Sequence, residues 1–309
     1  MRELEERPKK GRWFGKDTRF GYLSIVPALI LMSFFSAGPL VYALALSFQK
    51  YTLGAVERPF VFLENYQKLV ESKFFAPSLV NTLIFTVGAV VFVFLIALIF
   101  TLILNEKFRA NTWVRLALLI PWAIPEIANA LGWRWIFDSN WGVWNGIVVY
   151  GFGIFNSYQS WLGNPNYAMG TILVPHIWKE VPLATILLLA GISTIPKSLY
   201  EAAKLDGANV LARFRRITLP MLRPIIQLVL VYETIQGITS FAYVFVLTGG
   251  GPGYTTTTLS WLVWMTSFSF GDFGQGSCVA VIMSIIALLL TLLYFRLLPT
   301  KEFGAVTVR

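Results

Sequence analysis

The sequence is poor in charged residues. Asp, Glu, Lys and Arg make up 13% of its 309 residues, whereas roughly a quarter of the residues are charged in a soluble domain, whose surface faces water. Hydrophobic residues reach 56% and aromatic residues 16%, and the mean hydropathy is +0.65. This composition excludes an ordinary soluble globular protein and indicates a surface that faces lipid.

Residues that hold metals or nucleotides are also scarce. Cys278 is the single cysteine and His176 the single histidine, which excludes an internal disulfide and a cysteine or histidine metal cluster. No G-x-x-x-x-G-K-[ST] phosphate loop is present, and the nearest candidate, Gly249–Gly253, has no lysine and is interpreted as a turn. No nucleophile, metal or paired-acid pattern has recognisable spacing, so we predict neither a catalytic nor a metal site.

The net charge of +9 raises the question of nucleic-acid binding. That function needs a basic patch on a polar surface, whereas the basic residues here lie at the edges of apolar runs. We therefore expect membrane lipid, and no nucleic acid, as a partner.

Long apolar runs dominate the chain. A membrane-spanning helix needs about 20 apolar residues, since a rise of ~1.5 Å per residue must cross roughly 30 Å of hydrocarbon. The runs predict an all-α integral membrane protein with six transmembrane helices, near residues 21–48, 78–104, 115–137, 167–190, 222–247 and 275–297. The apolar segments 142–156 and 258–270 are short, so we expect interfacial helices or loops on the outer face, with tryptophans at headgroup depth.

Positive charge alternates along the connections between these helices. Residues 1–19 carry seven Lys or Arg, and together with 105–115, 191–223 and the C-terminal end they hold 19 of the 25. The positive-inside rule then predicts a multi-pass cell-membrane protein with both termini and segment 191–223 in the cytoplasm. The predicted organisation is a basic tail at 1–19, a transmembrane domain at 20–299 and a C-terminal tail at 300–309.

The connection at 193–223, between the fourth and fifth predicted helices, has readable local chemistry. Pro196 ends the preceding helix in this prediction, because proline lacks an N–H and restricts its neighbour. Ser198 and Glu201 have the spacing of a capping box, which predicts a short helix from Leu199. Gly207 permits a turn before a second short helix at 208–216. The residues alone leave two interpretations open, a solvated basic loop and a surface shaped for another protein.

A longer motif runs through the same segment. Glu201-Ala202-Ala203 is followed after three residues by Gly207, and after nine more by Ile217, Leu219 and Pro220. The motif resembles the cytoplasmic coupling loop of binding-protein-dependent ABC importer permeases. The resemblance covers most of the chain from about residue 20, and weaker matches at 81–82, 178–179, 189–191, 195–196 and 247–252 look like the carbohydrate branch, with its maltose, trehalose and glycerol-phosphate permeases.

The resemblance implies partners and a coupling mechanism. In that family the loop docks into a groove of the ATP-hydrolysing subunit, which makes the following residues candidates for ATPase coupling: Glu201, Ala202, Ala203, Asp206, Gly207, Ile217, Leu219 and Pro220. It implies two ATP-binding cassette subunits that bind ATP and Mg, so that this chain itself carries no cofactor and is not an enzyme. It also implies an extracytoplasmic solute-binding protein and a second permease subunit, either a copy or, as is common in carbohydrate systems, a different homologous chain.

Polar residues inside the predicted spans are candidates for the substrate path, because ionisable groups there need a partner or a water-filled cavity. The candidates are Trp178, Lys179, Glu180, Glu233, Gln236, Ser240 and Tyr243. Helical spacing puts Glu233, Gln236 and Ser240 on one face, which we interpret as the pore lining, with an interhelical polar network as the alternative.

Three further expectations concern single ionisable residues. We expect Lys179 to form an ion pair with Glu180 or Glu233, and His176 to be a hydrogen-bonded polar residue rather than a ligand. For Glu126 two roles stay open, stabilising a broken helix and forming the outer gate.

The leading hypothesis is a permease subunit of an ATP-driven ABC importer for a sugar, working by alternating access coupled to a partner ATPase. One alternative keeps the importer but changes the cargo to a non-sugar solute such as a peptide or amino acid. The other is an ion-coupled secondary transporter in which Lys179, Glu180 and Glu233 relay protons.

Overall fold

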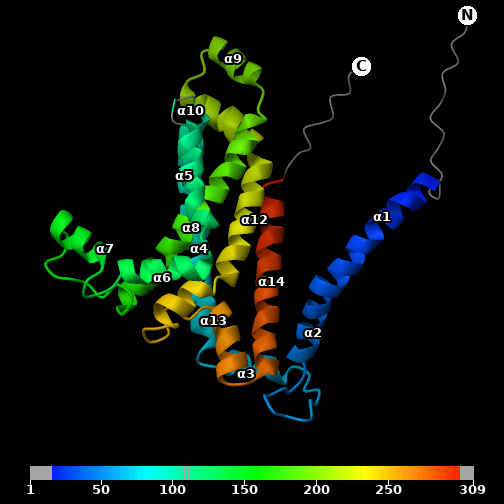
Figure 1. Cartoon of the computed structure of the whole chain (residues 1–309). Coiled ribbons are helices and arrows are strands. Elements are labelled where there is room, and N and C mark those ends of the chain that lie inside the picture. Colours follow the sequence, from blue (N-terminus) through cyan, green and yellow to red (C-terminus); the bar gives the residue numbers. More distant parts are fainter. Residues whose placement is uncertain (1–15, 107–108, 110, 300–309) are drawn as a thin grey trace, which may run out of the picture.

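Helices make up the architecture of the chain. The computed structural model describes residues 16–106, 109 and 111–299, and within these ranges no β-strand forms (Figure 1). The prediction of an all-α membrane protein is therefore confirmed. Residues 1–15 of the predicted N-terminal tail and the whole predicted C-terminal tail, 300–309, lie outside the described residues.

Four long helices form the central bundle: α4 (Phe75–Asn105), α8 (Pro165–Ser193), α12 (Arg223–Thr239) and α14 (Phe273–Leu297). Helix α4 packs against both α8 and α12, and α12 packs against α14 (Figure 1). Buried apolar side chains fill the seam between α4, α8 and α12: Val93, Ala97, Leu188, Leu222 and Val229. Their burial removes apolar area from water or lipid and packs the helices closely along their length.

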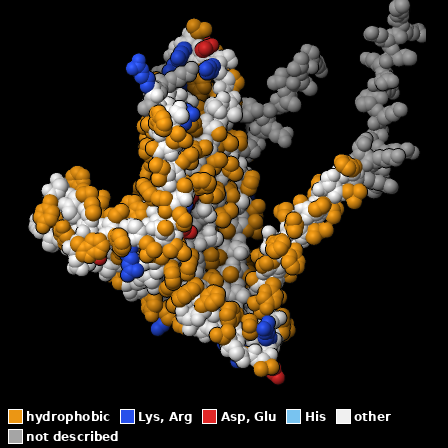
Figure 2. Space-filling model, viewed as in Figure 1, with side chains coloured by type: hydrophobic (Ala, Val, Ile, Leu, Met, Phe, Trp, Pro, Cys, Tyr) orange, Lys and Arg blue, Asp and Glu red, His pale blue; other side chains and the backbone are white. Residues whose placement is uncertain are grey.

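Among the described residues, five helical stretches are long and apolar enough to cross a bilayer. They cover 20–47, 75–105, 165–193, 223–248 and 273–297 and match five of the six predicted spans. Apolar side chains dominate the flanks of the bundle, as Figure 2 shows.

The remaining predicted span, 115–137, is broken. It forms α5 (Asn111–Ala123) and α6 (Glu126–Ile136), which meet at an angle of 95°. Pro125 causes the break, because it lacks a donor and pushes the preceding residue out of the helical region. The prediction of one helix over this range was wrong. Glu126 is the first residue of α6, where an acidic side chain offsets the helix dipole, and this position supports the first of its two open roles.

The first apolar segment stands apart from the bundle. Helix α1 (Lys16–Met32), the π-helical turn η1 (Ser33–Ala37) and α2 (Gly38–Ser47) run on from one another as a single arm, which contacts α14 through α2 (Figure 1). Side chains from Phe20 to Tyr42 are exposed along the arm. The arm therefore presents an apolar surface on every side for most of its length.

Two ends of the bundle can be distinguished. At one end the connection between α8 and α12 forms α9 (Lys197–Leu205), α10 (Val210–Arg213), η3 (Phe214–Thr218) and α11 (Leu219–Met221), with α9 projecting beyond the long helices (Figure 1). We call this the α9 end.

The opposite, or α3, end carries α3 (Glu64–Glu71) and the pair α13 (Leu259–Trp264) and η5 (Met265–Ser269) (Figure 1). The π-helical segment η4 (Val244–Thr248) extends α12 after a break. Beside the bundle, α7 (Val143–Gly146) and η2 (Ile147–Gly151) follow α6. These helices in 142–156 and 258–270 are too short to span a membrane, as predicted.

Candidate coupling and translocation sites

Helix α9 begins earlier than predicted and without a capping box. It starts at Lys197, with Pro196 as the N-cap residue at φ −59° and ψ 130°, and no side chain caps its first turn. Ser198 therefore lies inside the helix rather than at its cap. The extended backbone that proline favours sets the start of α9, so the predicted start at Leu199 was wrong.

Gly207 makes the turn that ends α9, as predicted. Its φ is +77°, in the left-handed region that favours glycine. The N–H of Ala208 donates to the carbonyl of Ala203 at 2.8 Å, and that of Gly207 donates to Lys204 at 3.0 Å. These two bonds are the pair of a Schellman motif, which satisfies the last carbonyls of the helix. A Cβ atom at Gly207 would meet nothing within 4 Å, so the glycine is required for its backbone conformation and not for space.

The second half of the segment leads directly into α12. Asn209 caps α10, its side-chain oxygen accepting from the N–H of Ala212 at 2.8 Å, so this helix starts two residues later than the predicted 208. Helix α10 continues through η3 and α11 into α12. Tyr200 and Thr218 are joined by a hydrogen bond of 2.9 Å between their hydroxyls, which ties α9 to this continuous element.

The motif residues fall into two groups. Glu201, Ala202, Asp206 and Gly207 are exposed and Ala203 is half-buried at the tip. Ile217, Leu219 and Pro220 are half-buried on η3 and α11, where the first two pack on the bundle core.

Two exposed apolar residues on the tip were not singled out from the sequence. Leu205 is 90% exposed and Val210 is 74% exposed, on either side of the Gly207 turn. Both side chains lie among charged residues at the end of the molecule rather than along the apolar flanks of the bundle. In the sequence, the only sign of this exposure was that Leu205 stands between the charged residues Lys204 and Asp206.

A chain of polar side chains bridges α8 and α12 within the bundle. The Tyr232 hydroxyl donates to a Glu180 carboxylate oxygen at 3.2 Å, and Gln236 Nε2 donates to the Tyr232 oxygen at 3.0 Å. Glu180 is buried, whereas Tyr232 and Gln236 are half-buried. The structure thus brings together two of the predicted path residues through a tyrosine between them.

Glu233 lies deeper, beside His176. Glu233 is fully buried, and its Oε2 is 3.9 Å from His176 Nε2. Neither carboxylate oxygen, nor this imidazole nitrogen, has a hydrogen-bond partner among the described residues. The expectation that His176 is fully hydrogen-bonded was therefore wrong at this atom. Phe85 and Tyr243 make T-shaped contacts with the imidazole, and the Glu233 carboxylate that faces Nε2 is too distant for a hydrogen bond.

Lys179 does not form the predicted ion pair with Glu180 or Glu233. Its ammonium donates to the carbonyl of Trp122 at 2.8 Å. That carbonyl lies in the last turn of α5, where no helical partner is available and a positive charge is favourable. The break in the third predicted span therefore created a partner for the lysine that the sequence pattern did not reveal.

The other predicted path residues lie elsewhere. Trp178 is 38% exposed and contacts Trp133 edge-on, away from α12. Ser240 follows the last residue of α12 and is buried, so the one-face pattern expected for residues 233, 236 and 240 fails there. Tyr243 is buried, and its hydroxyl accepts a hydrogen bond from Asn129 Nδ2 at 3.0 Å. In the sequence, the only sign of this partner was that Asn129 is a polar residue between apolar ones.

Comparison with known proteins agrees with this architecture. The family model described as binding-protein-dependent transport system inner membrane component matches residues 80–300. The trehalose/maltose transport system permease protein MalF of Thermococcus litoralis is 36% identical over 281 residues, covering 91% of this chain and 94% of that protein. The sulfoquinovosyl glycerol transport system permease protein SmoG of Agrobacterium fabrum is 35% identical over 302 residues, covering 96% of each.

A solved structure shares the fold. A chain of a bacterial ABC transporter involved in the import of the acidic polysaccharide alginate superposes with a TM-score of 0.78 at 22% identity, over 93% of this chain and 98% of that chain. The long helices, the α8–α12 connection and the similarity over nine-tenths of the length lead to the same conclusion. The chain belongs to the inner membrane components of binding-protein-dependent transport systems, as a multi-pass ABC permease subunit that translocates solute and is not an enzyme.

Proposed function

We propose that this permease subunit imports a sugar, with ATP hydrolysed by partner subunits. The two relatives above are named for trehalose/maltose and for sulfoquinovosyl glycerol, and both match along more than nine-tenths of this chain. The observation that carries the coupling to ATPase subunits is the α9–α10 tip, which projects beyond the long helices and exposes Leu205 and Val210 among charged residues.

In this proposal the α9 end lies in the cytoplasm, as do both termini. The segment 193–223 carries six Lys or Arg, and positive charge favours the cytoplasmic side. The bent pair α5–α6 counts as one of six crossings, because it starts near the α9 end where α4 finishes, and α8 then starts from the opposite side. Helix α5 alone has 13 residues, or about 20 Å, and does not cross unaided.

ATP-binding cassette subunits, which hold ATP and Mg, would dock on the tip. Leu205 and Val210 supply exposed apolar area, and Glu201 and Asp206 supply rim charges around it. Movement of the docked subunit reaches the bundle through the continuous η3–α11–α12 element and the Tyr200–Thr218 hydrogen bond. The exposed motif residues would touch the ATPase, and Ile217, Leu219 and Pro220 would transmit its motion.

The sugar would pass beside the polar chain of Glu180, Tyr232 and Gln236. A sugar hydroxyl both donates and accepts, and this chain offers a carboxylate, a phenol and an amide in a row. Glu233 lies behind Gln236 and joins the path only if the helices move apart, as alternating access requires. We assign Lys179 to holding α5 on α8, and Trp178 to the side away from the path.

A second permease subunit would complete the path and cover part of the exposed arm. A solute-binding protein would deliver sugar to the α3 end, since a solved relative was crystallised with an alginate pentasaccharide-bound periplasmic protein. We favour a different homologous chain as the second subunit.

The test is uptake into vesicles that contain this chain and the subunits that co-purify with it. We expect uptake of labelled sugar that requires ATP inside and the binding protein outside. Competition by amino acids or peptides but not by sugars would indicate a non-sugar importer. Uptake driven by an ion gradient, without the ATPase subunits, would establish a secondary transporter and overturn the proposal.

A further inference from the structure

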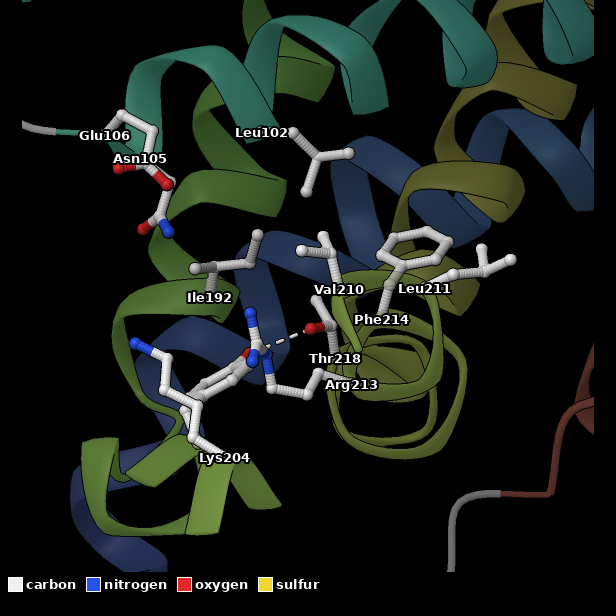
Figure 3. A pocket seen from close by; sticks show the side chains of 11 residues that line it. Leu102, Asn105, Glu106, Ile192, Lys204, Val210, Leu211, Arg213, Phe214 and Thr218 are labelled. Carbon is white, nitrogen blue, oxygen red and sulfur yellow. Dashed lines mark hydrogen bonds between the residues drawn. The ribbon is translucent and has the colours of Figure 1, made fainter. Parts of the chain in front are cut away.

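A cavity of about 620 Å³ lies beneath the tip, between the end of α4, the end of α8 and the α9–α10 turn (Figure 3). Leu102, Ile192 and Phe214 form part of its apolar lining, and Lys204 and Arg213 bring two positive charges to it. In Figure 3 both cationic side chains lie on the same side of the cavity, across from Leu102. The cavity thus combines apolar side chains from both the bundle and the tip with two cationic side chains from α9 and α10.

Arg213 is held in place and keeps donors available. One guanidinium nitrogen donates to the carbonyl of Ala208 at 3.1 Å, within the Gly207 turn. Guanidinium carries five N–H donors, so most of them stay available for an anion. The Lys204 ammonium donates to no group among the described residues, and Glu106 on the far wall leaves a net positive charge.

A second groove lies next to the first. It has a volume of about 490 Å³ and runs between α5 and α8, with Leu116, Leu119, Ile186 and Leu189 along it. Asn105, the last residue of α4, lines both cavities. A basic pocket at the ends of membrane helices therefore adjoins, at Asn105, a groove between α5 and α8 that is lined mainly by apolar side chains.

We propose that this pair of cavities binds an anionic phospholipid. The phosphate lies between Lys204 and Arg213, and an acyl chain lies in the α5–α8 groove. Lysine and arginine are the residues that bind phosphate oxygens most strongly, and basic pockets between helices at the cytoplasmic surface select anionic headgroups. The depth agrees, because Asn105 and Ile192 end the spans where headgroups begin.

The lipid would act on the coupling segment. Lys204 belongs to α9 and Arg213 to α10, so a phosphate shared between them stabilises the turn at Gly207 from its inner side. The assignment of this site to the cytoplasmic leaflet rests on the orientation given under the proposed function. Binding of the lipid can be measured on the isolated chain.

The test measures lipid binding to the purified full-length chain. Fluorescent phosphatidylglycerol and phosphatidylcholine are titrated in neutral detergent micelles, with wild type and a Lys204→Gln/Arg213→Gln variant. The matched control is Lys197→Gln/Arg216→Gln, which removes the same charge from exposed positions outside both cavities. We expect wild type to prefer phosphatidylglycerol, and the cavity variant to bind it about tenfold more weakly than the control does.

Equal loss in both variants would mean a diffuse surface attraction and would overturn the proposal, as would equal binding of the two lipids. An Ala190→Trp variant fills the groove, and its Lys204 and Arg213 are unchanged. It should weaken binding of the lipid, whereas unchanged binding, or full displacement by inorganic phosphate, would identify a soluble phosphate site instead. Since no ATPase or sugar is present, failure here leaves the proposed transport function untouched, and failure of transport leaves this binding result standing.

Discussion

Replacement of Gly207 tests how the tip is built and what it binds. An L-residue with a Cβ costs about 1–2 kcal/mol in the left-handed conformation, and the φ of +77° at Gly207 requires that conformation. No atom lies within 4 Å of the added Cβ, so steric overlap contributes nothing in the free chain. In Gly207→Ala, docking to the ATPase must therefore hold the turn in a conformation that costs this free energy. The affinity for the ATPase should fall about tenfold.

Two further substitutions at position 207 distinguish the effect of backbone conformation from the effect of a side chain on the docking surface. Asparagine adopts the left-handed conformation more readily than alanine, so Gly207→Asn should bind the ATPase more tightly than Gly207→Ala in spite of its larger side chain. Gly207→Arg adds a bulky charge to the docking surface as well as strain, and should abolish transport. All three variants should insert into the membrane normally, because the turn lies outside the bundle.

The assay is the affinity of each purified variant for the ATP-binding subunit, followed by uptake in vesicles. If alanine and asparagine variants bind equally, the left-handed backbone is not what the ATPase requires. If the arginine variant co-purifies and transports like wild type, the tip is not the docking site at all.

Other predictions concern the bundle and the path. Tyr200→Phe removes the hydroxyl bond between α9 and η3, worth about 1 kcal/mol, and should lower transport per ATP hydrolysed while preserving ATPase binding. Gln236→Ala should raise the KM for sugar uptake, whereas Trp178→Phe, on the other side of α8, should leave it unchanged. A raised KM in Trp178→Phe and an unchanged KM in Gln236→Ala would refute the proposed path. Gly237→Ala puts a Cβ 3.0 Å from a backbone atom of α4 and should destabilise the chain by about 1–3 kcal/mol in thermal unfolding, whereas Gly170→Ala, with nothing within 4 Å, should not.

Length and apolarity made much of the fold predictable. Helices α4, α8 and α14 lie within three residues of the predicted ends, because the bilayer thickness demands long apolar runs and the next polar residue or proline ends them. Gly207 was equally predictable, since only glycine adopts its backbone conformation without cost.

The broken span shows what the sequence alone did not reveal. Pro121 and Pro125 signalled a disturbance, but the 95° angle depends on what α6 packs against. Asn129 and Arg134 of α6 bond to the carbonyls of Pro175 on α8 and of residue 246 on η4, partners that are distant in the sequence. The periodicity of a sequence shows which residues lie on the same face of one helix. It does not show which other helix that face contacts.

The polar chain inside the bundle was predictable only in part for the same reason. Glu180 and Gln236, which Tyr232 joins, could be picked out because polar residues inside apolar runs stand out, and their role in a substrate path stays a prediction. Ser240 was misplaced, because α12 ends at Thr239 and the Ser260 hydroxyl donates to the Ser240 carbonyl that the helix leaves free. Lys179 donates to the carbonyl of Trp122 in the last turn of α5, and this carbonyl is free to accept only because the helix ends there.

Site-specific crosslinking between the tip and the ATP-binding subunit tests whether the tip is the docking site. In a Cys278→Ser background, Leu205→Cys offers a thiol at a position that is 90% exposed, and Val56→Cys offers one that is 97% exposed toward the α3 end. With a thiol-to-amine crosslinker, we expect a product with the ATP-binding subunit from position 205 and none from position 56. Crosslinks from position 56 and none from 205 would contradict both the docking site and the orientation of the chain.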